Sequence, residues 1–173
     1  AMEAGVEPDF VVGDMDSLRD VELLQRLPED RIKRFPPEKD NTDTELALEM
    51  LYAEQFDEVV LVGGGGGRMD HLIGILSLFH RNPHPSVWLT SGNEITAVDS
   101  MVQRGDLRGS TVSFFPVGNE PCRMRSHGLK WPLDGLVWTH GDVGISNEVV
   151  SDELRVEMIA GRLIMVRESE NHG

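Results

Sequence analysis

The first half of the chain alternates short strand-like segments with segments of helical periodicity. Residues 9–12, 31–35, 58–62 and 86–90 have the length and composition of strands, and most end at Gly, Pro or a polar turn. Between them, apolar residues recur at helical spacing in residues 17–27, 42–51 and 70–80. Strands that alternate with helices are typical of a parallel sheet with crossover helices, so we predict such a sheet here.

After about residue 91 the pattern changes to short segments rich in Val, Ile, Phe and Thr, separated by turns, and we expect no helix. These segments are residues 94–98, 111–117, 135–139, 148–150, 154–159 and 162–167. Such a pattern is typical of an antiparallel sandwich or barrel. The predicted fold is therefore α/β plus all-β: an N-terminal parallel α/β domain over residues 1–90, followed by a C-terminal antiparallel β-sandwich over residues 91–173.

Composition narrows the classes of function. The 173 residues carry a net charge of −14, and −11 of that falls in residues 1–58. So acidic a chain is a poor nucleic-acid binder, and no apolar run approaches the length of a membrane span. The single cysteine, Cys122, excludes an internal disulfide and a cysteine zinc cluster, which fits a reducing cytosol. We therefore predict a cytoplasmic protein that binds neither nucleic acid nor membrane.

Two acidic clusters stand at predicted strand ends and turns. Asp14 and Asp16 follow the first strand, and Asp43 lies just before the second helix. Residues two apart in an extended chain point the same way, and ligands of parallel sheets lie beyond the carboxyl ends of the strands. Magnesium favours a few carboxylates together with phosphate oxygens. The structural alternative is that Asp16 caps a helix, Asp14 lies in a turn, and Asp43 complements the helix N-terminus.

A run of five glycines, residues 63–67, separates the third strand from the next helix, and Arg68 follows it. Glycines at this place let backbone amides approach phosphate, and Arg68 can clamp a phosphate group. The run matches neither a Walker A loop nor a dinucleotide fingerprint. Asp70 is either the helix cap or a ligand or base, and His71 is more simply explained by packing or exposure.

In the second half, Trp131 could stack on a flat heteroaromatic ligand, and Ser146 and Asn147 could bond to ring nitrogens. The alternatives are a core tryptophan and an ordinary Ser-Asn turn.

Five blocks of the sequence, in this order, resemble the thiamine pyrophosphokinase family, which transfers diphosphate from ATP to thiamine. The blocks are residues 8–17 (PDFVVGDMDS), 40–45 (DNTDTE), 66–71 (GGRMDH), 128–133 (GLKWPL) and 144–148 (GISNE). The resemblance implies a catalytic domain that binds ATP and Mg²⁺, a β-sandwich domain that binds thiamine, and a homodimer with active sites at the subunit interface.

The resemblance also implies a role for individual residues. The residues implied to bind Mg²⁺ are Asp14, Asp16 and Asp43. The residues implied to be catalytic are Asp70, Asp43 and Arg68. The residues implied to bind ATP are Gly66, Gly67, Arg68, Asp40 and Thr44. The residues implied to bind thiamine, from the sandwich domain of the partner subunit except for His71, are Trp131, Ser146, Asn147 and His71.

One departure from the family pattern concerns the start of the chain. Members usually have a strand and an Asp-Gly-Gly segment before the Gly-Asp-x-Asp-Ser block, whereas only residues 1–8 precede it here. We expect the catalytic domain to lack that first strand, either because the sequence is shortened or because the protein does without it. Two alternative functions remain at this point: transfer of diphosphate to another hydroxymethyl heterocycle such as a pterin, and non-catalytic binding of a nucleotide or metabolite.

Overall fold

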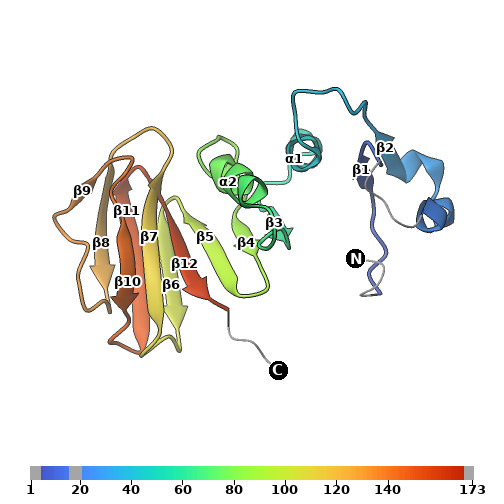
Figure 1. Cartoon of the computed structure of the whole chain (residues 1–173). Helices are drawn as coiled ribbons and strands as arrows, with labels where there is room; N and C mark the ends of the chain where they lie inside the picture. The colour runs from blue at the N-terminus through green and yellow to red at the C-terminus, as the bar shows by residue number, and fades with distance from the viewer. Residues whose placement is uncertain (1–4, 16–20, 170–173) are drawn as a thin grey trace. The chain divides into compact units, whose positions relative to one another are not determined.

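The computed structural model describes residues 5–15 and 21–169, with side chains described from residue 24 onward in the second range. It is mostly β with few helices, and the chain forms two compact units, Ala1–Phe56 and Asp57–Gly173 (Figure 1). No helix in these described ranges has the length and apolar content that crossing a membrane requires.

The first unit is built on a short parallel pair of strands. β1 (Val11–Gly13) pairs with β2 (Ile32–Arg34), and the 3₁₀ helices η2 (Val21–Arg26) and η3 (Glu29–Arg31) lie between them in sequence. The helix predicted over residues 17–27 is therefore a 3₁₀ helix in its described part. Leu24, Leu27 and Ile32 form a small cluster of buried residues in the described part of the first unit.

The α-helix α1 (Asp43–Ala53) completes the described part of the first unit. It begins where the capping pattern of residues 42–45 predicts.

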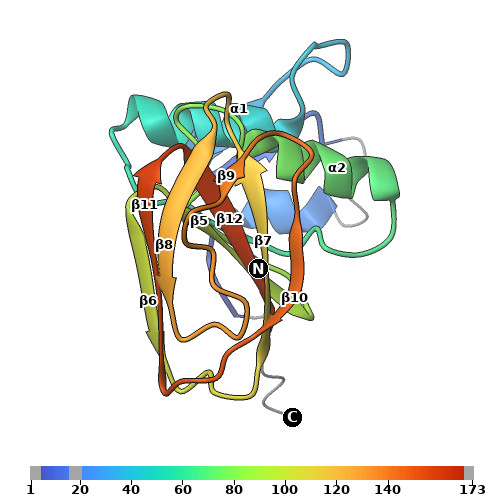
Figure 2. The ribbon, with the colours of Figure 1, turned by 90° about the vertical axis from the view of Figure 1, so that its left-hand side faces the viewer.

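The second unit contains two sheets. The six-stranded sheet has the order β10-β7-β12-β5-β4-β3, and the four-stranded sheet has the order β6-β11-β8-β9. Figure 2 shows the strands from β5 to β12 from the side on which β8 lies. The strands and helix, in chain order, are β3 (Val60–Val62), α2 (Met69–Leu78), β4 (Val87–Leu89), β5 (Asn93–Val98), β6 (Met101–Gly105), β7 (Thr111–Val117), β8 (Cys122–His127), β9 (Val137–Trp138), β10 (Gly144–Glu148), β11 (Glu153–Ala160) and β12 (Arg162–Glu168). As predicted, no helix occurs after residue 91 in the part of the chain that is described.

The prediction of one parallel sheet in residues 1–90 is not confirmed. The parallel pair β1–β2 and the parallel pair β3–β4 belong to different sheets, and β4 pairs antiparallel with β5, so the larger sheet is mixed. The antiparallel pairing of β4 with β5 follows from a tight turn between Thr90 and Asn93. The backbone N–H of Thr90 donates to the Asn93 carbonyl at 2.8 Å, and the Thr90 hydroxyl accepts from the Asn93 N–H at 2.8 Å. This turn reverses the chain directly after β4.

The main hydrophobic core lies between the two sheets, because both contribute buried residues to it. β12 shows the underlying alternation: Leu163 and Met165 belong to this core, whereas Ile164 belongs to a second cluster that includes Leu72 and Leu76 of α2. Side chains of successive residues in a strand point to opposite faces, so β12 is buried on both sides. α2 covers the outer face of the six-stranded sheet.

A half-buried arginine ties β12 to the end of α2. The guanidinium of Arg162 donates to Asp99 Oδ1 at 2.5 Å, to the Phe79 carbonyl at 3.2 Å and to the Arg81 carbonyl at 2.9 Å. Phe79 is the residue that ends α2. Arg162 therefore satisfies carbonyl groups that a helix end leaves unpaired, and it joins segments about eighty residues apart in sequence.

Candidate active site

Two predicted ligand residues come together at the carboxyl end of β1. Asp14 follows β1 directly, and Asp43 is the first residue of α1. Thr42 caps α1: its hydroxyl accepts from the Glu45 N–H at 3.3 Å, and the Glu45 carboxylate accepts from the Thr42 N–H at 2.7 Å. The predicted capping box is present, so the cap does not use the Asp43 carboxylate.

Gly13 lets the Asp43 carboxylate lie against the end of β1. A Cβ atom at Gly13 would be 2.7 Å from Oδ2 of Asp43 and 3.0 Å from its Cγ. Gly13 is also buried and has a φ of +150°, a conformation that side chains with a Cβ rarely adopt. Glycine is therefore favoured at this position for two reasons: the backbone conformation and the close approach of the Asp43 carboxylate.

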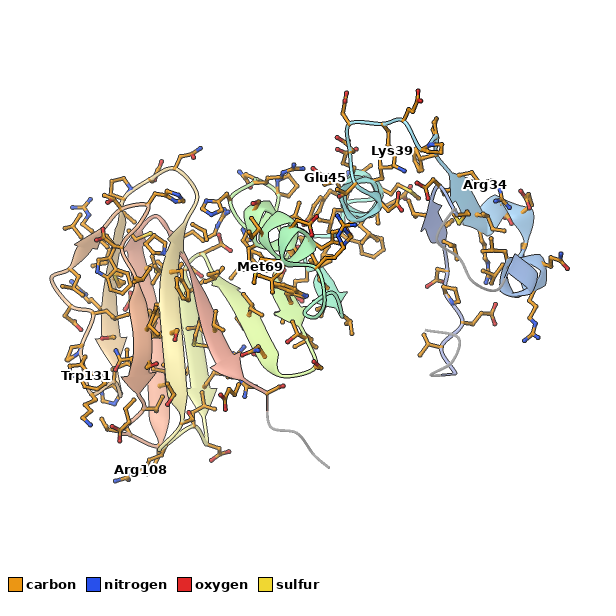
Figure 3. All side chains as sticks on the ribbon, viewed as in Figure 1. Arg34, Lys39, Glu45, Met69, Arg108 and Trp131 are labelled. Carbon is orange, nitrogen blue, oxygen red and sulfur yellow. The ribbon has the colours of Figure 1, made fainter. Side chains whose placement is uncertain are left out.

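A lysine that the sequence analysis did not single out lies between these two acids. The Lys39 ammonium is 2.8 Å from Asp43 Oδ1 and 3.8 Å from Asp14 Oδ2, and only 15% of the Lys39 side chain is exposed. Figure 3 shows Lys39 close to the start of α1. The available signal was its spacing, four residues before Asp43, which allows contact at the start of a helix.

The geometric reason for pairing Asp14 with Asp16 does not hold. Met15 has a φ of +65°, so the chain is not extended between the two acids. Met15 packs against the core of the first unit, which explains why the chain turns there. A non-glycine residue in this conformation costs roughly 1–2 kcal/mol. Asp16 itself lies outside the described residues.

The described acids fit a cation, although they do not complete a metal site by themselves. Asp14 and Asp43 already share one positively charged group, and carboxylate oxygens are the donors that hard divalent cations prefer. Within residues 5–15 and 21–169, no group of three metal-ligating side chains is close enough to hold a metal ion. Of the residues implied to bind nucleotide, Asp40 is exposed in the preceding turn and Thr44 is half-buried in α1.

The glycine run between β3 and α2 divides into packed and open positions. A Cβ at Gly64 would meet Ile75 at 2.7 Å, and one at Gly65 would meet Thr90 at 2.3 Å. At Gly66 and Gly67, no described atom lies within 4 Å of the Cβ position, and both residues are exposed. Close packing therefore explains two members of the run, whereas Gly63 and the two residues implied to bind nucleotide, Gly66 and Gly67, face open space.

Arg68 and Asp70 form an exposed ion pair at the start of α2. The Arg68 guanidinium donates to both carboxylate oxygens of Asp70, from Nε at 3.1 Å and from Nη2 at a shorter distance, and the His71 N–H donates to Asp70 Oδ1 at 3.1 Å. The Arg68 hydrogen bond is the main cause that lowers the pKa of Asp70 to about 2. Asp70 is the second residue of α2 and not its cap, and His71 is exposed.

In the second unit, Asn147 holds the backbone of Trp131. The Asn147 side-chain oxygen accepts from the Trp131 N–H at 3.2 Å, and its amide donates to the Trp131 carbonyl at 2.7 Å. Asn147 is 5% exposed and Trp131 is 56% exposed. The core alternative for Trp131 is therefore wrong, and the Asn147 side chain already has two backbone partners.

Ser146 lies in a bulge of β10. Its φ is +60°, and its N–H donates to the Ser113 hydroxyl at 3.0 Å, where the pairing register with β7 shifts. Lys130 lies 5.0 Å from the centre of the Trp131 ring and pairs with Glu148 at 2.6 Å. Ser146, with its strained backbone, and the Trp131 ring, which the Lys130 ammonium contacts, therefore lie in neighbouring segments.

Trp131 and α2 lie at different ends of the second unit. Figure 3 shows Met69, the first residue of α2, and Trp131 on opposite sides of the two sheets. One copy of this unit therefore does not bring Trp131 to the Arg68–Asp70 pair.

A cavity of about 480 Å³ opens between α2, the outer face of the six-stranded sheet and the β9–β10 connection. Most of its lining is apolar, and Leu72, Trp88, Phe115 and Val143 are among the residues that form it. None of the predicted site residues lines it, but their chain neighbours Gly65 and Leu72 do, so the cavity adjoins the glycine run and the start of α2.

Two features of this mostly β chain are typical of a protein that binds a nucleotide together with a metal ion. One is the pair of acids around the Lys39 ammonium at a strand end, and the other is the open Gly-Gly-Arg turn before a helix. Comparison with known proteins specifies the family. Residues 1–89 match the family model "Thiamin pyrophosphokinase, catalytic domain", and residues 99–163 match "Thiamin pyrophosphokinase, vitamin B1 binding domain". The chain belongs to the thiamine pyrophosphokinase family.

Individual relatives agree with this assignment. The chain is 27% identical to thiamine pyrophosphokinase of Bacillus subtilis, over 98% of this chain and 82% of the relative. It is 24% identical to thiamine pyrophosphokinase 2 of Arabidopsis thaliana, over 86% of this chain but only 60% of that protein.

Two solved structures show the same fold. The crystal structure of the Bacillus subtilis thiamine pyrophosphokinase has a TM-score of 0.81 at 26% identity, covering 98% of this chain and 82% of that one. That of the Geobacillus thermodenitrificans protein has a TM-score of 0.75 at 31% identity, covering 99% and 82%.

Proposed function

We propose that this protein transfers a diphosphate group from ATP to the hydroxyl group of thiamine, which gives thiamine diphosphate and AMP. The observation that carries the proposal is the convergence of Asp14 and Asp43 on one positive charge at the end of β1, in a chain that matches both family models. The catalytic domain comprises residues 1–90 and the thiamine-binding domain comprises residues 91–173.

The carboxylates of Asp14 and Asp43, with Asp16, hold Mg²⁺ in this proposal. Bound Mg²⁺ supplies charge neutralisation and polarisation of the phosphoryl group under attack. The open backbone at Gly66 and Gly67 and the guanidinium of Arg68 bind the polyphosphate, and Asp40 and Thr44 line the nucleotide site.

The thiamine hydroxyl oxygen forms a bond to the β-phosphorus of ATP while the bond from that phosphorus to the α,β-bridging oxygen breaks. AMP leaves with this oxygen. The hydroxyl proton passes to a carboxylate or to water. A carboxylate with a pKa of about 2 is a weak proton acceptor, so Asp70 serves mainly to orient Arg68 and to oppose the positive charge of thiamine. His71 lies next to this pair.

Trp131 offers an exposed ring to the thiazolium or pyrimidine of thiamine, and Ser146 lies in the neighbouring bulge. Asn147 contributes by holding the Trp131 backbone. In this proposal the protein acts as a homodimer in which Trp131 of one subunit serves the catalytic domain of the other, and the separation of Trp131 from α2 in one copy supports it.

The test is AMP release from ATP on addition of thiamine. The wild type is expected to release AMP only with thiamine and a divalent cation, and a hydroxymethyl pterin is not expected to replace thiamine. Asp43→Asn should lose this activity, whereas Asp57→Asn, at an exposed position outside the site, should keep it. AMP release that does not depend on thiamine would refute the proposal.

A further inference from the structure

Lys39 occupies the point at which the Asp14 and Asp43 carboxylates converge. Its ammonium lies 2.8 Å from Asp43 and 3.8 Å from Asp14. The side chains of Lys39 and Asp14 are only 15% and 18% exposed. A hydrogen bond from the Lys39 N–H to the Pro37 carbonyl, 3.1 Å long, forms the turn that brings Lys39 to this place.

This arrangement differs from an ordinary surface ion pair. A pair four residues apart on a helix face is worth only about 0.3–0.5 kcal/mol, because water screens it. Lys39 precedes α1 and contacts a second acid that belongs to a different segment. The Asp14 carboxylate is largely shielded, whereas the Asp43 side chain is 47% exposed. Two carboxylates that share one ammonium repel each other unless a cation lies near them, and Gly13 allows Asp43 to stay there.

We propose that Lys39 is a positioning residue that neutralises Asp14 and Asp43 while no metal is bound and moves to the polyphosphate when a divalent cation takes the two carboxylates. The inference rests on the proposed function, since it concerns the metal–nucleotide site of that reaction. A lysine suits this role because its compact ammonium is carried on a flexible stem of four carbons.

The consequence is a coupling between metal and nucleotide. A metal ion alone has to displace the ammonium, so it binds weakly. A metal bound with a nucleotide displaces the ammonium onto a new anionic partner, so the two bind better together than separately.

The test measures binding and does not depend on turnover. Mn²⁺ is titrated into the nucleotide-free protein by electron paramagnetic resonance, for the wild type, Lys39→Met and Lys39→Gln. Removal of the competing ammonium should tighten Mn²⁺ binding about tenfold. Lys39→Arg keeps the charge and should retain weak binding, and Lys33→Met serves as a matched control because Lys33 contacts Phe10 and not these acids.

The same variants are then titrated with α,β-methylene-ATP at saturating Mg²⁺. Lys39→Met and Lys39→Gln should bind this nucleotide about tenfold more weakly, because the polyphosphate has lost a cationic partner. Opposite shifts in the two titrations support the inference. Mn²⁺ affinity that is unchanged or weakened in both neutral variants overturns it, as does unchanged nucleotide affinity.

The outcomes also separate this inference from the proposed function. If the wild type releases no AMP with thiamine but the two opposite shifts occur, the reaction is wrong and the role of Lys39 stands. If AMP release depends on thiamine but the shifts are absent, the reaction stands and Lys39 is a structural ion-pair partner only.

Discussion

Replacement of Gly13 by alanine tests whether the position of Asp43 governs activity. The added Cβ would lie 2.7 Å from Asp43 Oδ2, whereas ordinary contacts begin at 3.4 Å, so the carboxylate has to move by about 0.7 Å. The substitution also places a Cβ on a residue whose φ is +150°. Two effects are therefore expected: backbone strain, which lowers stability, and displacement of a carboxylate, which lowers activity.

The magnitudes of these effects can be separated. Strain at a residue in a sparsely populated backbone conformation costs about 1–3 kcal/mol of stability. A displacement of about 1 Å at a reacting centre can cost on the order of 100-fold in rate, so we expect kcat/KM to fall about 10- to 100-fold. This fall corresponds to about 1.4–2.7 kcal/mol of transition-state stabilisation.

The assay is thiamine-dependent AMP release, measured well below the melting temperature of the variant so that unfolding does not contribute. Gly109→Ala is the matched control: Gly109 has a φ of +84°, but no described atom lies within 4 Å of its Cβ position. It should lose stability and keep its activity. The reasoning is refuted if Gly13→Ala is destabilised to a similar degree as Gly109→Ala and keeps full kcat/KM.

Three further predictions concern the second unit. Arg162→Met removes three hydrogen bonds from a group that is 18% exposed, so it should lower stability by about 2–4 kcal/mol and the melting temperature by about 4–16 °C. Arg155→Met, which breaks an exposed pair 3.6 Å long, should change stability by less than about 0.5 kcal/mol, and equal melting temperatures would contradict the assignment. The carboxyl carbon of Asp70 should titrate near pH 2 by NMR, and Arg68→Leu should raise this pKa toward the ordinary value of about 4. Because the pKa is lowered in the folded protein, the ion pair stabilises the fold above pH 4 and loses that effect as the pH falls toward 2; a midpoint that Arg68→Leu does not move would show that another group sets it. Trp131→Ala should raise the KM for thiamine about tenfold while leaving the KM for ATP within about twofold, and equal changes in both would argue against a stacking role.

The sequence predicted local structure better than it predicted sheet topology. Strand composition located β3 and β4, and the capping residues 42–45 located the start of α1. β6 and β8 were missed, and the segment predicted at residues 148–150 meets β10 only at Glu148. In β8 (CRMRSH), three basic side chains alternate with the buried Cys122 and Met124 or follow them, which hides the apolar pattern. Local patterns did not predict which strands pair with each other. The turn at Thr90, for example, makes β5 run antiparallel to β4.

The candidate site shows the same division. Motif order alone indicated the family, and the roles assigned to individual residues remain predictions. Extended-chain geometry was the wrong reason for pairing Asp14 and Asp16, because Met15 turns toward the core of its unit. The spacing of Lys39 and Asp43 is compatible with a contact between them, but no local pattern indicates that the same lysine also reaches Asp14.

The sequence by itself determined the residue types, their order and the local elements, because capping, strand alternation and turn chemistry act between residues close in the chain. Only the tertiary structure decided which glycines are packed and which are open, that the Asn147 side chain bonds to the Trp131 backbone, and that Lys39 lies between two acids. Those facts depend on distances between atoms of separate segments. They follow from how the core packs, which local sequence does not encode.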